Sequence, residues 1–181
     1  MSELEAEWAQ RLAEAEARAR TSGRSDVADY LALRALNDMA RNVGIEWLLS
    51  IFTAHAGEVN RTGASVIIAH ADAHRFRVGN SQMVGRRLTL TAGVRVLTVE
   101  AGWPRTPRDG IVRGGGLATA RVSHFGSRRD DDELLLVQNA ERDAATTTIA
   151  PPRWLILDAD GARRAAFEEA RARHHVAKLL H

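Results

Sequence analysis

The sequence of 181 residues contains no cysteine. Disulfides, thiolate metal sites and cysteine nucleophiles are therefore excluded. Lysine is almost absent too, since Lys178 stands alone beside 24 arginines. A Walker-type phosphate loop requires a lysine after its glycines, so that motif is excluded. Schiff-base catalysis requires a lysine amine and is disfavoured for the same reason.

Aromatic residues and long apolar runs are also scarce. Aromatic residues make up 5% of the chain, and proteins that bind single-stranded nucleic acid need aromatic platforms on which bases stack. The most apolar run, residues 45–54, is too short to span a bilayer. The first ten residues lack the basic start and apolar stretch of a signal peptide. We therefore expect a cytoplasmic protein with no membrane association, for which nucleic acid is a weaker partner.

Charge is distributed unevenly along the chain. Residues 75–129 hold eleven arginines and two acids, a net charge of +9, whereas the remaining residues carry −7. This asymmetry predicts an anionic partner for the middle segment. The alternative is that acidic helices of the same chain pack beside it. The arginines are residues 75, 77, 86, 87, 95, 105, 108, 113, 121, 128 and 129.

The N-terminal segment, residues 2–20, has the pattern of an amphipathic helix. Leu4, Trp8 and Leu12 recur every four residues and form a narrow apolar stripe. A stripe this thin suits docking on the rest of the chain or on a second subunit, so a homo-oligomer formed through this helix is one expectation. Residues 21–25, "TSGRS", break the helix.

A second helix is predicted to begin at Ser25, which suits an N-cap. Gly44 leaves two alternatives open: a break followed by a new helix over 45–56, or one helix over 26–56 that tolerates the glycine at a cost of about 1 kcal/mol. Gly57 is expected to close it in either case. The predicted buried face comprises Val27, Tyr30, Leu31, Leu36, Met39 and Val43.

From Gly63 the apolar period changes from that of a helix to two, which is typical of strands. Roughly seven short strands follow, with a hairpin turn at "TAG" (residues 91–93) and a charged turn at residues 126–132 that we expect to be solvated. A final helix is predicted over 162–180 with Asp160 as its N-cap. His174 and His175 near its end are expected to complement its dipole.

The order of these elements predicts the fold class. Helices do not alternate with strands, so the sheet should be antiparallel. We predict an α+β fold with N-terminal helices, then an antiparallel β-meander sheet or half-barrel of about seven strands, then a C-terminal helix. Residues 1–24 are expected to form the N-terminal amphipathic helix, and residues 25–181 a single α+β domain.

One candidate metal site lies in "HADAH", residues 70–74. On a continuous strand His70, Asp72 and His74 would share one face, and imidazole and carboxylate ligands suit Zn²⁺ or Fe²⁺. Residues four apart on a straight strand are separated by roughly 13 Å, so all three side chains cannot reach one ion. Two of them together with His124 could do so more easily. The alternative is a short turn flanked by two ordinary histidines.

The second candidate is the loop "GWPRTPRDGIVRGGG", residues 102–116. Its arginines can hold phosphate or carboxylate with paired hydrogen bonds, and its glycines let the backbone approach a ligand closely. Trp103 could stack on a planar group, or fold back on the sheet in a solvated hairpin loop. The expected ligand-binding residues are Trp103, Arg105, Arg108, Arg113, Arg121 and His124.

Together these features favour a non-enzymatic binding module. Its basic sheet and the 102–116 loop would hold a small anionic ligand or an acidic protein surface, without a cofactor. Two alternatives stay open. One is a metal-dependent enzyme that uses His70, His74 and His124, with Asp72 as ligand or base. The other is an oligomeric structural or adaptor protein.

Overall fold

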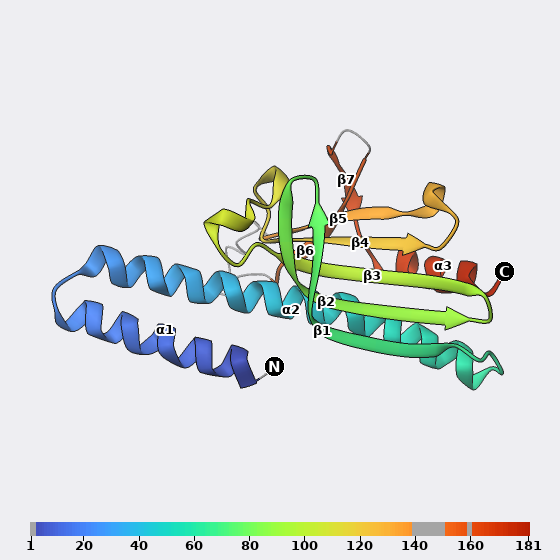
Figure 1. The fold of residues 1–181 in the computed structure, drawn as a ribbon, viewed down its shortest axis with the longest axis horizontal. Coiled ribbons are helices and arrows are strands. Elements are labelled where there is room, and N and C mark those ends of the chain that lie inside the picture. Colours follow the sequence, from blue (N-terminus) through green and yellow to red (C-terminus); the bar gives the residue numbers. More distant parts are fainter. Residues whose placement is uncertain (1–2, 139–150, 159–160) are drawn as a thin grey trace, which may run out of the picture. The chain divides into compact units, whose positions relative to one another are not determined.

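The computed structural model describes residues 3–138, 151–158 and 161–181 (Figure 1). Two helices are followed by seven strands in one antiparallel sheet and by a third helix, which confirms the predicted α+β architecture. The chain divides into two compact units, Met1–Asn42 and Val43–His181, and each is described by itself. No helix in the described residues is both long and apolar enough to cross a bilayer.

The first unit is a helical hairpin. Helix α1 (Glu3–Thr21) and the beginning of α2 (Ser25–Arg61) are joined by a turn in which Gly23 has a φ of 71°. The guanidinium of Arg34 lies over the Trp8 ring, 5.1 Å from its centroid. The break predicted at residues 21–25 is therefore present. Among the residues of this unit whose burial is described, the buried side chains are Leu12, Ala19 and Ala28.

The predicted buried face of α2 is largely wrong. Tyr30, Leu36 and Met39 are 62%, 52% and 66% exposed, and Val43 is 52% exposed. Within the first unit this part of α2 packs against α1, and a hairpin of two helices buries only a narrow stripe of each helix. Val27 and Leu31 lie closer to that stripe and are half-buried.

Helix α2 passes through Gly44 without a break, which decides between the two alternatives. A Cβ at Gly44 would lie 2.7 Å from both terminal carbons of the Leu136 side chain. The Gly44 carbonyl also accepts a hydrogen bond of 2.8 Å from the indole N–H of Trp154. The glycine thus serves close packing on the sheet. Gly57 does not close the helix as predicted, because the helix continues to Arg61.

The sheet follows the chain, in the order β1 to β7, so the predicted meander is confirmed. Each strand pairs with the next in antiparallel register. The "TAG" turn joins β2 to β3 through the Ala92–Arg95 pair. The strands are β1 (Ile67–Val78), β2 (Ser81–Ala92), β3 (Arg95–Trp103), β4 (Ala118–His124), β5 (Asp132–Val137), β6 (Arg153–Leu157) and β7 (Arg163–Ala166).

One face of the sheet forms the main core. The C-terminal half of α2 and helix α3 (Glu169–Leu180) pack on this face. Alternating strand residues point into the core because side chains on a strand alternate between faces. The second face carries polar and charged residues such as Glu100, Arg121 and Glu133 together with apolar residues such as Leu135. Fully buried members of the core include Leu48, Phe52, Leu88, Leu90, Leu97, Val99, Val122, Leu134, Trp154 and Leu179.

The predicted start of the final helix is wrong. Residues 163–166 form the edge strand β7, and α3 begins only at Glu169, after Glu168 as N-cap. Pairing with β6 decides the structure here: Ala166 is the register partner of Leu155, and the Phe167 N–H donates to the Trp154 carbonyl over 2.8 Å. Asp160, the predicted N-cap, lies outside the described residues.

The hairpin of β1 and β2 bends away from the rest of the sheet (Figure 1). On β1 the register shifts between Ala71 and His74, and Ala73 has a φ of 52°, which together define a β-bulge. Gly85 and Gly102 are register partners near the bend. A Cβ on Gly85 would lie 1.9 Å from the Ala101 carbonyl oxygen, so the bend requires glycine there.

The two glycines of α2 give a matched test of this packing. We expect Gly44→Val to lower the free energy of unfolding by about 1–3 kcal/mol, because the larger side chain overpacks the contact with Leu136. Gly57→Ala should raise it by up to about 1 kcal/mol, since no atom lies within 4 Å of the added Cβ. Urea unfolding followed by circular dichroism measures both. A Gly44→Val protein as stable as the parent would contradict the packing.

Candidate functional site

The residues of the predicted metal site are separated by the bulge in β1. His70 pairs with Leu88 and His74 with Gly85, so the extra residue reverses the alternation and puts the two histidines on opposite faces of the sheet. The segment is therefore neither the straight strand nor the turn of the two earlier alternatives. Among the described residues, no group of three His, Asp or Glu side chains could hold a metal ion.

Two of the three candidate ligands in that segment, Asp72 and His74, have other partners. The Asp72 carboxylate lies 3.4 Å from Nε of Arg86. The Nε2 atom of His74 lies 2.6 Å from Oε1 of Glu100, and its ring stacks on Phe76. These contacts stabilise the bent hairpin and leave the predicted Zn²⁺ or Fe²⁺ site without structural support.

The 102–116 loop folds back on the sheet. Trp103 is only 4% exposed, and the Arg105 guanidinium lies 3.8 Å from the centroid of its ring. A Cβ at Gly116 would lie 2.4 Å from Leu135, and one at Gly110 would lie 2.3 Å from the Ser81 hydroxyl. The loop glycines thus permit close packing on the second face of the sheet, and Trp103 belongs to the core.

The remaining predicted ligand-binding residues do not form one group. Arg108 and Arg113 are exposed in short 3₁₀ turns of the loop. Arg121 lies on the second face of β4, where its register partners are Glu100 and Glu133. His124 is the register partner of the buried Leu97, so it lies on the face that α3 covers. The structure therefore separates His124 from the arginines with which it was grouped.

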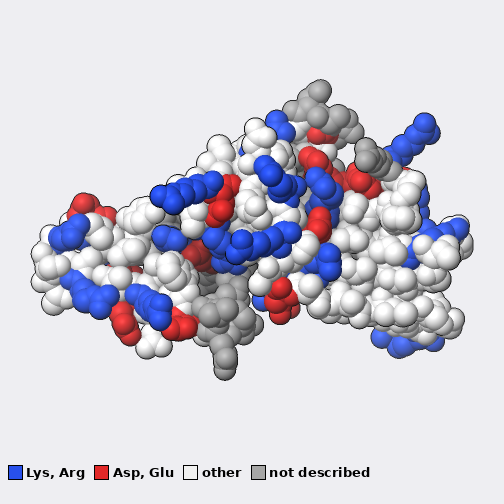
Figure 2. Space-filling model, viewed as in Figure 1, with Lys and Arg blue, Asp and Glu red and all other residues white. Residues whose placement is uncertain are grey.

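Part of the positive charge of residues 75–129 is compensated within the chain. Arg86 forms an ion pair with Glu46 of α2, and Nη2 of Arg121 lies 4.0 Å from the Glu133 carboxylate. Figure 2 shows acidic side chains among the lysines and arginines on the visible face. Intramolecular pairing, one of the two alternatives for the charge asymmetry, thus accounts for some of these arginines.

A hydrogen-bonded chain of four side chains connects the sheet to α3. Nε2 of His124 lies 3.0 Å from Nδ1 of His175, and Nε2 of His175 lies 2.9 Å from Oδ2 of Asp132. Arg171 donates to both oxygens of Asp132, over 2.7 and 2.8 Å. His175 is 1% exposed and Asp132 is 6% exposed. We call His124, His175, Asp132 and Arg171 the histidine relay.

Local structure explains why these residues meet. On α3, Arg171 and His175 are four residues apart and therefore lie on one side of the helix. The same side carries the buried Ala172, Val176 and Leu179. Asp132 begins β5 as the register partner of Val122, so it lies on the core face, like His124 two residues later on β4. The apolar packing of α3 thus brings the polar groups together.

The charges of the relay follow from its surroundings. Burial alone would raise the pKa of Asp132, but hydrogen bonds from Arg171 and His175 and the positive charge of Arg171 hold it well below its ordinary value. Hydrogen bonding to Asp132 raises the pKa of Arg171. Burial, and then the neighbouring His175, lower the pKa of His124. Asp132 is therefore a carboxylate and His124 a neutral imidazole at neutral pH.

The ionised carboxylate of Asp132 determines which ring nitrogens of His175 and His124 carry hydrogen when both imidazoles are neutral. An ionised carboxylate only accepts, so His175 donates its Nε2–H to Asp132 and has an acceptor at Nδ1. His124 then donates its Nε2–H to that acceptor, which leaves a lone pair on Nδ1 of His124. The relay thus ends in a basic nitrogen.

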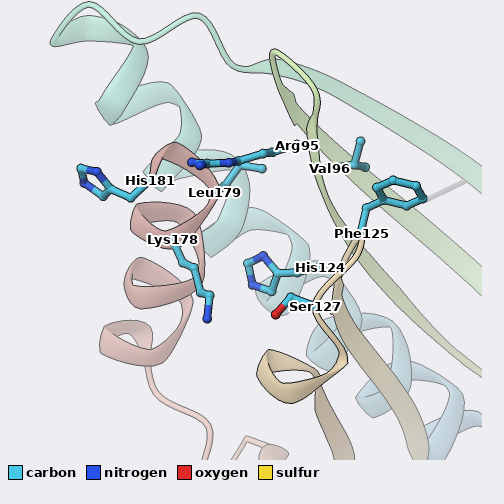
Figure 3. A pocket seen from close by; sticks show the side chains of 8 residues that line it. All are labelled: Arg95, Val96, His124, Phe125, Ser127, Lys178, Leu179 and His181. Carbon is cyan, nitrogen blue, oxygen red and sulfur yellow. The ribbon is translucent and has the colours of Figure 1, made fainter.

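A pocket lies beside His124, between the β3 and β4 ends and α3 (Figure 3). It is an open depression with a cavity volume of about 240 Å³. Asp130 forms an ion pair with Lys178 and accepts a hydrogen bond of 2.5 Å from Ser127. These contacts lower the pKa of Asp130 to about 2, with the Lys178 hydrogen bond as the main cause. The lining residues are Arg95, Val96, His124, Phe125, Ser127, Lys178, Leu179 and His181.

Most residues of this site were not predicted from the sequence. His175 was expected to complement the helix dipole and Asp132 to lie in a solvated turn, and both expectations are wrong because both side chains are buried. The spacing of His175 from Ala172 and Leu179 did place it on the apolar side of the helix. Only the packing of α3 on the sheet pairs it with Asp132 and His124.

Asp132→Asn should lower the free energy of unfolding by about 3–5 kcal/mol at pH 7, because it removes the charge that pairs with Arg171 and His175. The folded-state pKa of Asp132 is depressed, so its contribution is present above its unfolded pKa of about 4 and is lost as the pH falls. The difference between variant and parent should therefore shrink below about pH 4.

Urea unfolding from pH 7 down to pH 3 measures this difference. Glu133→Gln is the matched control: its carboxylate lies 4.0 Å from Arg121 at an exposed position, and such pairs contribute little. A deficit for Asp132→Asn that stays constant down to pH 3 would show that its carboxylate is not ionised in the folded protein.

Comparison with known proteins adds no relative. The chain matches no protein family model, no curated protein and no solved structure. Its function must therefore be argued from the geometry of the pocket and the histidine relay.

Proposed function

We propose that the protein binds a small organic anion in the pocket beside His124. The observation that carries the proposal is that Arg95, Lys178 and His181 line the same depression as His124. This proposal keeps the small anionic ligand expected from the composition but moves its site from the 102–116 loop to the other end of β3. It remains a binding function.

Arg95 is the principal anion-binding group of this proposal. It lies at the start of β3 with an exposed side chain, and a guanidinium binds carboxylate or phosphate through paired hydrogen bonds. The charge of Lys178 is already compensated by Asp130. With Lys178 already paired, the pocket has little positive charge left to offer a ligand. A ligand with one or two negative charges therefore suits it better than a polyanion such as nucleic acid.

The rest of the lining is apolar and sets the second property of the ligand. Val96 and Leu179 line the pocket, as does Phe125, which is 83% exposed. Covering a large exposed aromatic ring with a ligand removes apolar surface from water, which favours binding. We therefore expect a ligand with a hydrocarbon or aromatic part, and a small aromatic carboxylate combines both properties.

Thermal unfolding in the presence of inorganic phosphate or benzoate tests the proposal, with sodium chloride added to keep the ionic strength constant. A ligand that binds only the folded state stabilises it, by about 2.7 kcal/mol at a hundredfold excess over Kd. We expect stabilisation by at least one of these anions, and a loss of affinity of at least tenfold in Arg95→Gln.

Arg108→Gln is the matched control, since it removes the same charge from an exposed position in the loop. It should leave the affinity for either anion unchanged. The opposite result, in which Arg108→Gln weakens binding and Arg95→Gln does not, would return the site to the 102–116 loop. Absence of stabilisation by both anions would refute anion binding at the pocket.

A further inference from the structure

We infer that His124 is a general base that activates water to hydrolyse an acyl ester of the small anion held in the pocket. The observation that carries the inference is the histidine relay, which joins a basic nitrogen beside an open pocket to a buried carboxylate. The inference rests on the proposed function for its substrate class. It goes beyond that function because it assigns a reaction.

The two ring nitrogens of His124 have different surroundings. Nε2 is engaged with His175. No hydrogen bond to Nδ1 occurs within the described part of the chain. Figure 3 shows the His124 ring on the pocket wall between Arg95 and Ser127, facing α3. A hydrogen bond on one nitrogen that fixes the tautomer and leaves the other free to take a proton is the arrangement of a catalytic histidine.

The proton transfer balances without another reactant. The oxygen of a water molecule bonds to the ester carbonyl carbon while one of its protons passes to Nδ1 of His124. The Nε2–H of His124 can then shift to Nδ1 of His175, which spreads the positive charge toward Asp132. When the tetrahedral intermediate collapses, the carbon–oxygen bond to the leaving group breaks. The shared proton moves back from Nδ1 of His175 to Nε2 of His124 as His124 gives its Nδ1 proton to the departing oxygen, so both histidines return to their starting neutral forms.

His175 and Asp132 are positioning residues in this scheme. The Asp132 carboxylate stabilises the imidazolium that forms, as the buried acid does in a Ser-His-Asp triad. Arg171 keeps that carboxylate ionised. The charge of Arg171 opposes the imidazolium, so Asp132 and Arg171 shift the basicity of the histidine pair in opposite directions.

Within the described residues, the charged and titratable groups around His124 come from α3, β5, β3, the turn before β5, and His181. From α3 these are His175, Lys178 and Arg171, and from β5 Asp132. From the turn before β5 the Asp131 carboxylate accepts the backbone N–H of His124 over 3.1 Å, and Asp130 lies nearby. Arg95 of β3 and the terminal His181 line the same pocket.

Water, and not a side chain, is the nucleophile. Ser127 is the only hydroxyl among the pocket-lining residues, and it donates to Asp130 over 2.5 Å. Its hydroxyl proton is therefore directed to Asp130 and not to Nδ1 of His124. The substrate class that follows is an ester whose acid or alcohol part carries a carboxylate, held by Arg95, with the acyl carbon near Nδ1 of His124.

Two chromogenic esters test the reaction: 4-acetoxy-3-nitrobenzoate, which carries a carboxylate, and 4-nitrophenyl acetate, which is neutral. We expect the full chain to hydrolyse the anionic ester with at least tenfold higher kcat/KM than the neutral one. His124→Gln should lower kcat for both esters at least tenfold. His174→Gln, on the exposed side of α3, is the imidazole control and should leave both rates unchanged.

The pH profile separates catalysis from folding. Rates should rise with pH as His124 loses its proton. Asp132→Asn should shift the midpoint of this rise to lower pH and lower the plateau about tenfold, because the imidazolium loses its carboxylate. Arg171→Gln should shift the midpoint to higher pH. A purely structural role of the relay would lower the amplitude in both variants without shifts of opposite sign.

The outcomes distinguish this inference from the proposed function. If phosphate or benzoate binds in an Arg95-dependent manner but hydrolysis does not depend on His124, the inference is wrong and the binding function stands. If His124-dependent hydrolysis occurs with equal kcat/KM for the two esters and neither anion binds, the base is correct and the anion specificity is wrong. Hydrolysis lost equally in His174→Gln would also overturn the assignment.

Discussion

The second unit is organised around a buried carboxylate. Asp132 lies at the start of β5 on the face of the sheet that forms the core, and an unpaired charge there would be strongly destabilising. Arg171 and His175 compensate it, and both belong to α3. The position of α3 on the sheet is therefore specified by hydrogen bonds as well as by apolar contacts. The same contacts bring His124 into the relay and open the pocket beside it.

The sheet separates two kinds of chemistry by its faces. The face covered by α2 and α3 holds the apolar core, and the histidine relay lies at its margin. The second face carries Glu100, Arg121 and Glu133 as neighbours in register, packed in part by the 102–116 loop. Arg121, one of the arginines of the basic middle segment, thus lies on the face opposite to the relay, and the pocket draws on few charged groups.

The sequence predicted regular elements well and residue partners poorly. The "TAG" hairpin and the order of the strands follow from alternating apolar residues and turn residues, which are local signals. Gly44 and Gly57 look alike in sequence, yet only Gly44 meets the sheet closely. The prediction that His70, Asp72 and His74 share one face was wrong because one extra residue in a strand reverses the side to which the following side chains point. That bulge depends on how β1 pairs with β2, and the spacing of apolar residues within one segment does not reveal this pairing.

What the sequence determined by itself is the α+β class, the antiparallel meander, and the exclusion of thiol chemistry and of a Walker-type phosphate loop. These follow from composition and from the spacing of apolar residues, which act over a few neighbouring positions. The tertiary structure alone decided the site. His124, Asp132 and His175 come from three elements separated along the chain, and their contact exists only once β4, β5 and α3 are packed together. Burial then sets which of these groups carries charge, because desolvation and hydrogen bonding act through space and not along the sequence.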